Sequence, residues 1–210
     1  MDIYQIFITY NRMWSWREIV CFSIVVLVAF LLLYRAVRDG RIQMVQAIAF
    51  MLLLAFLGIV FESTVFTRTT IRRQAELVPF WSWKAIIRYH DRELLKEDLL
   101  NCILLLPVGV LLPFVRNKVI KARDAFVAGF LISLCIETSQ LILARGLFEW
   151  DDMIHNAFGC MVGCILVNQL FRCYQTLKVK RQKNVGSKNS HESITDSKMI
   201  QQYHNNNTIK

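Results

Sequence analysis

The sequence has few of the features that mark disulfide-bonded secreted domains or common soluble enzymes. Only 3 prolines and 8 glycines occur in 210 residues, and no two of the 6 cysteines form a CxxC motif. Most of the cysteines lie in apolar stretches, where cysteine behaves as a small hydrophobic residue. No HExxH motif, phosphate-binding loop or nucleophile elbow is present. We therefore expect no disulfide framework, no metal site and no cofactor.

Hydrophobic side chains are abundant instead, at 55% of the chain, and they come in long runs. A helix needs about 20 residues to cross a bilayer, and about 17 are tolerated. Five runs reach or approach this length: 19–34, 42–61, 99–115, 125–143 and 153–171. The third run holds two prolines, which a membrane helix tolerates where neighbouring helices satisfy the freed carbonyls. The sequence thus predicts an all-α fold, a polytopic transmembrane bundle of about five spanning helices.

The basic residues predict how these helices are oriented. Arginine and lysine concentrate in 35–41, in 116–123 and after residue 171, and such short basic segments stay on the cytoplasmic side. An odd number of spans places the two termini on opposite sides. We therefore expect a multi-pass protein of the cell membrane with its N-terminus outside and its C-terminus in the cytoplasm. The connections 62–97 and 144–152 then lie on the outer surface.

Three regions follow from this pattern. Residues 1–41 comprise an interfacial segment, the first transmembrane helix and a cytoplasmic loop, and 42–172 form the main transmembrane domain. Residues 173–210 are polar and lack apolar periodicity, so we expect a disordered basic tail. Because the other basic residues border membrane spans, they reflect topology, and we expect no nucleic-acid partner. The sequence indicates no particular oligomeric state.

Polar and small residues line one face of each of the last two predicted helices. At 100° per residue, Glu137 and Gln140 share a narrow stripe on the fourth helix. A second stripe, on the fifth helix, contains Asp152, Asn156, Gly159 and Gly163. The spacing of its two glycines lets a partner helix approach closely. Both stripes should face protein rather than lipid.

The ionisable residues near the spans gather toward the predicted outer leaflet. An unpaired acid at mid-bilayer costs about 2.5–3.5 kcal/mol, so these acids must face one another, Arg145 or water. We expect a hydrated pocket open to the outer surface, with Glu137 at its floor and Arg145, Asp152 and Asn156 near its rim. The alternative is a closed polar network that only joins the helices. Interhelical hydrogen bonds in membranes are worth about 0.6 kcal/mol on average, which favours the pocket.

Three segments between residues 60 and 170 form a recognisable set of motifs. They are LVPF at 77–80, EDLLNCILLLPVGVLLP at 97–113, and ETSQLILARGLFEWDDMIHNAFGCMVG at 137–163. Together they resemble the VanZ-like family. The family's pattern maps onto Asn101, Pro107, Gly109, Glu137, Gln140, Arg145, Asp152, Asn156, Gly159 and Gly163. The chain departs from that pattern at Glu76, where asparagine is usual, and at Leu106, where an aromatic residue is common.

The resemblance implies a biological setting and no particular reaction. The family's namesake is an accessory membrane protein linked to reduced susceptibility to teicoplanin-type glycopeptides, which target a cell-wall precursor at the outer surface. We therefore expect a cell-envelope protein that confers or modulates antibiotic resistance by binding or handling an amphiphile. The expected partner is a membrane lipid or a lipid-linked cell-wall precursor, with a lipoglycopeptide as a further candidate.

The candidate residues allow three kinds of function. In a binding protein, Arg68 and Arg145 contact a phosphate or carboxylate, and the other polar groups bond to sugar or peptide. Those other groups are Asn101, Glu137, Gln140 and Asn156, and Asp152 lies with them in the expected pocket. In an intramembrane enzyme acting on a lipid head group, Glu137 and Asp152 form the base and acid. In a structural role, the polar stripe docks another envelope protein. A metal held by Asp151, Asp152, His155 and Glu137 would lack a recognised ligand spacing.

Overall fold

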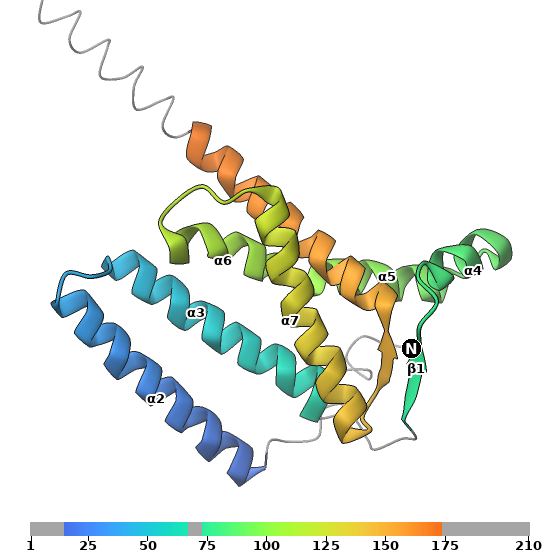
Figure 1. Ribbon diagram of the computed structural model, residues 1–210, viewed down its shortest axis with the longest axis horizontal. Helices are drawn as coiled ribbons and strands as arrows, with labels where there is room; N and C mark the ends of the chain where they lie inside the picture. The colour runs from blue at the N-terminus through green and yellow to red at the C-terminus, as the bar shows by residue number, and fades with distance from the viewer. Residues whose placement is uncertain (1–14, 67–72, 174–210) are drawn as a thin grey trace, which may run out of the picture. The chain divides into compact units, whose positions relative to one another are not determined.

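The computed structural model describes residues 15–66 and 73–173 (Figure 1). The chain divides after Asn168 into two units, and the arrangement below concerns the first, residues 1–168. The predicted interfacial segment before residue 15, Arg68, and the predicted tail from residue 174 lie outside the described residues.

The all-α prediction is confirmed, since five helices of the described chain are long and apolar enough to cross a membrane. The helices are α2 (Trp16–Arg38), α3 (Met44–Phe61), α4 (Trp81–Tyr89), α5 (Arg92–Leu104), α6 (Leu106–Arg116) and α7 (Ala122–Leu143). A further helix, here called the C-terminal helix, spans Trp150–Cys173. The short elements are the π-helical turn η1 (Glu62–Phe66) and the strands β1 (Gln74–Glu76) and β2 (Leu147–Glu149). Two of the spans are composite, with η1 extending α3 and α6 continuing α5.

The third span begins seven residues before the apolar run that predicted it, at Arg92 instead of residue 99. Its start is set by a cap, because the Asp91 carboxylate accepts hydrogen bonds from the backbone N–H groups of Glu93 and Leu94. Charged residues therefore make up much of the first two turns. The span breaks between α5 and α6, where Pro107 stands in the first turn of α6. Proline has no N–H to donate to the carbonyl four residues earlier.

Two short strands lie in the connections that the sequence predicts as loops, and they link these connections to each other. β1 and β2 pair in parallel, with Gln74 beside Leu147 and Glu76 beside Glu149. The segment after η1 is thereby fastened to the segment after α7. The strands lie at the same end of the bundle as the π-helical turn (Figure 1). We call this end, with η1, β1, β2, α4 and the first turns of the C-terminal helix, the polar end.

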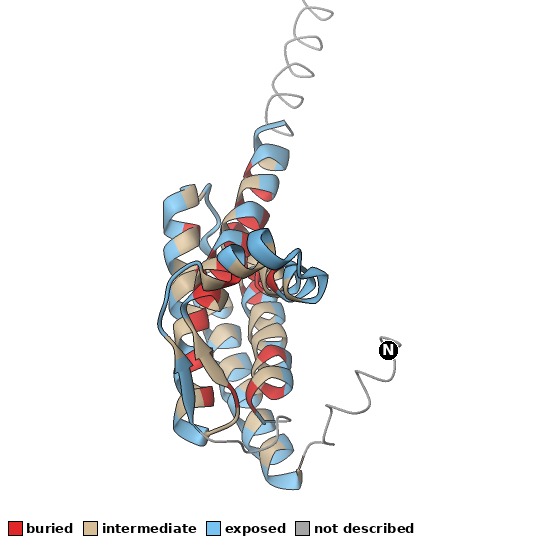
Figure 2. Ribbon diagram, turned by 90° about the vertical axis from the view of Figure 1, so that its right-hand side faces the viewer, coloured by how far each residue is buried: buried red, intermediate tan, exposed pale blue. Residues whose placement is uncertain are grey.

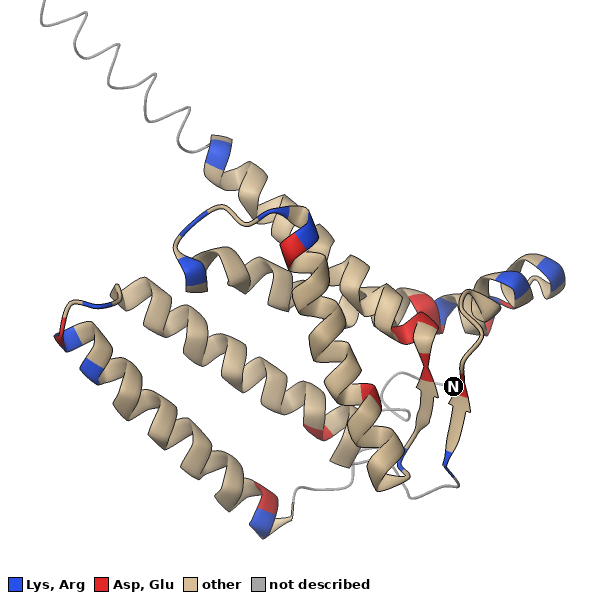
Figure 3. Cartoon of the chain, viewed as in Figure 1, with Lys and Arg blue, Asp and Glu red and all other residues tan. Residues whose placement is uncertain are grey.

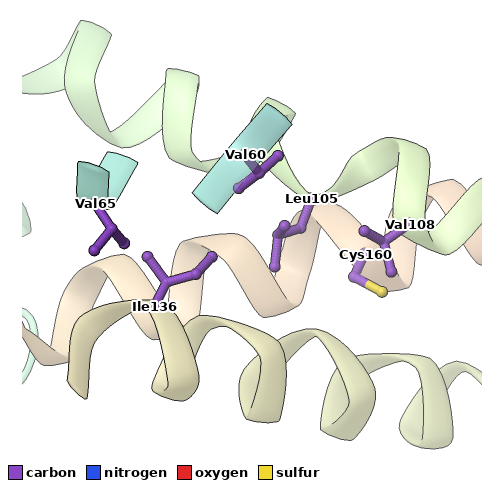
Figure 4. Packing of buried hydrophobic residues seen from close by; sticks show 6 residues of the cluster. All are labelled: Val60, Val65, Leu105, Val108, Ile136 and Cys160. Atoms are coloured by element: carbon purple, nitrogen blue, oxygen red, sulfur yellow. The ribbon is translucent and has the colours of Figure 1, made fainter. Parts of the chain in front are cut away.

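A hydrophobic core lies between the helices and reaches η1. Its six buried residues are Val60, Val65, Leu105, Val108, Ile136 and Cys160. They come from α3, η1, the α5–α6 junction, α6, α7 and the C-terminal helix, and their side chains converge in Figure 4. The C-terminal helix is the most buried span, and α2 has no buried residue (Figure 2). The outermost span is therefore α2, which packs on α3.

Three glycines allow the closest helix contacts. A Cβ at Gly159 would fall on the carbonyl of Cys102, and one at Gly163 would fall on the carbonyl oxygen of Leu106. A Cβ at Gly109 would in turn collide with the carbonyl of Cys160. The C-terminal helix therefore meets α5 and α6 backbone to backbone, as small residues at one-turn spacing allow.

Most carboxylates gather at one end of the bundle, whereas lysine and arginine occur at both ends, α4 included (Figure 3). Lysine and arginine mark the connection between α2 and α3 and the connection between α6 and α7, at the end away from η1 (Figure 3). Carboxylates lie at the ends of α3 and α7 and around β2 and α5, at the polar end (Figure 3).

Candidate functional site

The end of α7 is fixed from two sides by residues that the sequence singles out. Glu137 is 3% exposed, and its Oε2 accepts a hydrogen bond of 3.2 Å from the backbone N–H of Glu149. The Nε2 of Gln140 donates to the carbonyl of Thr64 over 3.0 Å. Helix α7, which is the fourth predicted span, is thus bonded to β2 on one side and to η1 on the other.

Arg145 follows α7 in a turn that brings it back to η1. Ala144 adopts a left-handed conformation with φ 54°, and the backbone N–H of Arg145 then bonds to the carbonyl of Gln140 at 2.8 Å. This is a common way to end a helix. The Nη1 of Arg145 donates to the carbonyl of Phe66 over 2.6 Å. The arginine therefore lies beside the π-helical turn.

The remaining predicted residues bind the C-terminal helix to its neighbours. Asn101 donates from Nδ2 to Oδ1 of Asp152 at 2.5 Å, which joins α5 to the first turn of that helix. Asn156 donates from Nδ2 to the Ser133 hydroxyl of α7 at 2.8 Å. Each of these bonds has its donor and its acceptor on different helices.

The predicted residues take part in a set of hydrogen bonds between elements, which we call the polar network. Asn101 and Asp152 bond to each other, and the others bond to neighbouring groups. Glu137, Gln140 and Asn156 are almost fully enclosed. Their bonds go to protein groups, which is the geometry that the closed-network alternative describes. A hydrated pocket with Glu137 at its floor stays a prediction, and Arg68 lies outside the described residues.

Asp151 is a structural residue whose role the sequence did not reveal. Its Oδ1 accepts from the backbone N–H of Phe80 at 2.5 Å, and its Oδ2 accepts from the N–H and the hydroxyl of Ser82 at 3.0 and 2.8 Å. A carboxylate at the start of a helix satisfies free N–H groups and complements the helix dipole. Asp151 therefore anchors the beginning of α4, about 70 positions away in sequence.

His155 lies one turn further along the same face and has two polar neighbours. Its Nε2 accepts a hydrogen bond of 2.7 Å from the indole N–H of Trp83. Since indole can only donate, Nε2 carries no proton, and the neutral ring carries it on Nδ1. That nitrogen lies 3.6 Å from Oδ1 of Asp98, and both side chains are buried. In the sequence, the i, i+4 spacing of Asp151 and His155 was the feature that could have indicated that both lie on one face of the helix.

This cluster has no metal-site geometry. Within residues 15–66 and 73–173, no group of three or more histidine, cysteine, aspartate or glutamate side chains could hold a metal ion. The carboxylates instead act on one another. Burial raises the pKa of Glu149 from 4.5 to about 7, and repulsion from neighbouring acids adds to the effect. Those acids are Asp152, Asp151, Glu97 and Asp98.

A cavity of about 560 Å³ lies beside the network, between α2 and α3. Its walls are mainly apolar side chains of the two helices, and Glu62 and Phe66 of η1 line its end. The Phe66 carbonyl that accepts from Arg145 belongs to the same turn. The polar network and the apolar cavity therefore meet at η1.

These features define a class of protein, a multi-pass α-helical membrane protein with a polar network at one end of its bundle. The chain belongs to the VanZ/LLP1 family, whose model matches residues 44–172. The match runs from α3 through the C-terminal helix and leaves α2 outside. No curated protein and no solved structure matches the chain. Membership of the family links the chain in general terms to glycopeptide resistance.

Proposed function

We propose that this protein lowers susceptibility to teicoplanin-type glycopeptides by binding an amphiphile at the polar end of its bundle. The amphiphile is a membrane lipid, a lipid-linked cell-wall precursor or a lipoglycopeptide, each of which joins an apolar chain to a polar head. The observation that carries the proposal is the contact at η1 between an apolar cavity and a polar network. Ligand pockets commonly combine apolar walls with a few fixed polar groups.

Arg145 is the best-placed residue for contact with an anionic head group. Its bond to the Phe66 carbonyl uses one of the five N–H donors of the guanidinium. The side chain is partly exposed, so further donors can reach a phosphate or a carboxylate in a paired arrangement. Burial of Glu137 and Gln140 behind it holds the end of α7 in place.

The distribution of charge supports an outward-facing polar end. The connections at the opposite end contain Arg38, Arg41, Arg116, Lys118 and Lys121. Short loops with this composition favour the cytoplasmic side, which puts η1 and the β-strands at the outer surface. A cell-wall precursor and a glycopeptide are both accessible there.

Binding is favoured over catalysis by the bonds of the two acids. An acid–base pair must reach the reacting atoms of a substrate. Glu137 accepts from the Glu149 backbone and Asp152 accepts from Asn101, so both carboxylates are held to protein groups. The intramembrane enzyme and the structural partner of another envelope protein are the alternatives that the experiment below separates.

The test measures teicoplanin susceptibility in cells that express the wild type, Glu137→Gln, Arg145→Ala or Asp152→Asn at matched membrane levels. We expect Arg145→Ala to restore most of the susceptibility of cells without the protein. The matched control is Arg88→Ala, which removes an exposed arginine of α4 next to Tyr89. It should protect as the wild type does.

Each alternative gives a different result. If all three variants protect as the wild type does, the proposed site is wrong. If the protein is an enzyme, Glu137→Gln and Asp152→Asn should abolish protection, and both variants should still bind the amphiphile. A purely structural network predicts that the variants accumulate less protein in the membrane, and that protection equals that of the wild type once the levels are matched.

A further inference from the structure

The cavity between α2 and α3 has the size of a ligand site. Its volume of about 560 Å³ falls within the range of about 300–1,000 Å³ that small-molecule pockets occupy. Phe22 and Val25 of α2 and Leu54 and Leu57 of α3 supply much of its apolar wall. The two helices therefore leave room for an apolar chain between them.

Glu62 places a carboxylate at one end of this apolar space. It begins η1, lines the cavity and is 6% exposed. Within the part of the chain that the structure describes, no hydrogen bond or ion pair within 4 Å joins its carboxylate to another residue. The hydroxyl of Thr64, two residues away, donates to the Val60 carbonyl instead. A buried carboxylate without a partner is costly, because it loses hydration without compensation.

The charges around the cavity favour a cationic partner. Glu62 and Glu18 both line the cavity, and Arg17 is the basic residue on its wall. Arg145 is a second cationic neighbour of Glu62, although it forms no ion pair with Glu62 within 4 Å. Glu18 accepts a hydrogen bond from the backbone N–H of Ser15, so this carboxylate is already engaged at the start of α2. Among the described residues, Glu62 is the cavity-lining carboxylate that accepts no hydrogen bond. A protonated amine supplies both the charge and the N–H donors that a carboxylate lacks.

We propose that the α2–α3 cavity binds an amphiphile with a protonated amine in its head group, which donates to the Glu62 carboxylate. The inference rests on the proposed function for the class of ligand, an amphiphile whose anionic group contacts Arg145. It adds a protonated amine to the same head group and gives the position of the alkyl chain. The alkyl chain lies along the apolar walls between α2 and α3. One wall, α2, lies outside the region that the family model matches. Part of the proposed binding site therefore comes from the N-terminal region, which the family model does not cover.

The test uses two photoreactive probes on the purified full chain in detergent. One probe is a twelve-carbon alkylamine with a diazirine in its chain, and the other is the alcohol of the same chain. Labelled peptides are identified by mass spectrometry over a concentration series. In the wild type, we expect the amine to label α2 and α3 at concentrations at least tenfold below those the alcohol needs.

Variants separate the carboxylate from the cavity. Glu62→Gln keeps the shape of the side chain and should raise the half-labelling concentration of the amine at least tenfold, with that of the alcohol unchanged. Leu54→Trp fills the cavity and should abolish labelling of α2 and α3 by both probes. Glu93→Gln is the matched control, because this exposed acid pairs with Lys96 outside the cavity. It should leave both probes unchanged.

Two results would overturn the inference. Equal labelling by amine and alcohol in the wild type would show that charge is not recognised, and unchanged labelling in Leu54→Trp would place the probes elsewhere. If Glu62→Gln does not fold, the comparison of the two probes in the wild type and in Leu54→Trp still decides. Because no antibiotic is present, a failed susceptibility test with intact labelling refutes the proposed function alone.

A competition experiment identifies the source of the amine. The labelling is repeated in lipid nanodiscs that contain either an ethanolamine or a glycerol head group on the same acyl chains. Loss of amine labelling in the ethanolamine nanodiscs alone assigns the site to a membrane lipid. Labelling that persists in both assigns it to an amphiphile from outside the bilayer.

Discussion

Replacement of Asp151 by alanine removes the carboxylate that accepts three hydrogen bonds at the start of α4. Two of the donors are the backbone N–H groups of Phe80 and Ser82, and the third is the Ser82 hydroxyl. Ser82 is 2% exposed, so water cannot fully replace the lost acceptor. Phe80 also has a left-handed backbone with φ 60°, which costs a non-glycine residue about 1–2 kcal/mol. Asp151 offsets that strain.

The magnitude follows from the bonds that are lost. A hydrogen bond to a charged group contributes about 1.5–3 kcal/mol. The three share one carboxylate, and the exposed Phe80 can rebond to water, so we expect a net loss of about 3 kcal/mol in the docking of α4. At about 1.4 kcal/mol per tenfold change, the population of undocked α4 rises on the order of 100-fold.

Hydrogen exchange of the α4 backbone in detergent, followed by mass spectrometry, measures this population. Exchange of the α4 peptide should accelerate on the order of 100-fold in Asp151→Ala. Asp91→Ala is the matched control, because it removes a carboxylate that caps α5 instead. It should affect the first turn of α5 and leave α4 protected. A change in α4 below threefold, or an equal change in both variants, would refute this account of the anchor.

Three further variants test packing and ionisation. Gly159→Ala should destabilise the folded protein by about 1–3 kcal/mol in thermal unfolding, because the new methyl group meets the backbone carbonyl of Cys102. Gly58→Ala should cost less, since its methyl group meets the ring of Phe22, which can rotate away. Glu149→Gln should stabilise the protein by about 1–3 kcal/mol at pH 8 and by almost nothing near pH 4.5.

The sign of the Glu149 effect follows from its raised pKa of about 7. Between pH 4.5 and 7 the folded state holds a proton that the unfolded state releases, so the wild type loses stability as the pH rises. Glutamine has no proton to lose, and the slope disappears. A slope unchanged in the variant would refute the assignment. For the glycines, an equal cost at both positions would show that backbone contact is not the cause.

Several parts of the fold could be predicted because they depend on local sequence alone. A long apolar run commits a segment to a membrane helix, since each backbone group must bond within the segment in lipid. The five spans followed from this rule. Their ends did not, because a polar cap at Asp91 starts a helix before the apolar run begins.

The sequence predicted which residues belong to the candidate site, but it did not predict which groups they bond to. Periodicity placed Glu137 and Gln140 on one face of a helix, and the structure joins that face to Glu149 and Thr64. The pairing of β1 with β2 brings together segments that contain no strong strand signal. The spacing of residues along one helix predicts neither these hydrogen bonds nor the pairing of the strands.

The sequence by itself determined that this chain forms membrane-spanning helices, which of their faces are polar, and where glycines permit close approach. Tertiary structure alone decided that Asp151 anchors α4, that His155 lies between Trp83 and Asp98, and that Glu62 faces an apolar cavity. The physical reason is distance along the chain. Burial and hydrogen-bond partners depend on which helices become neighbours, and residues about 70 positions apart meet only after the bundle has packed.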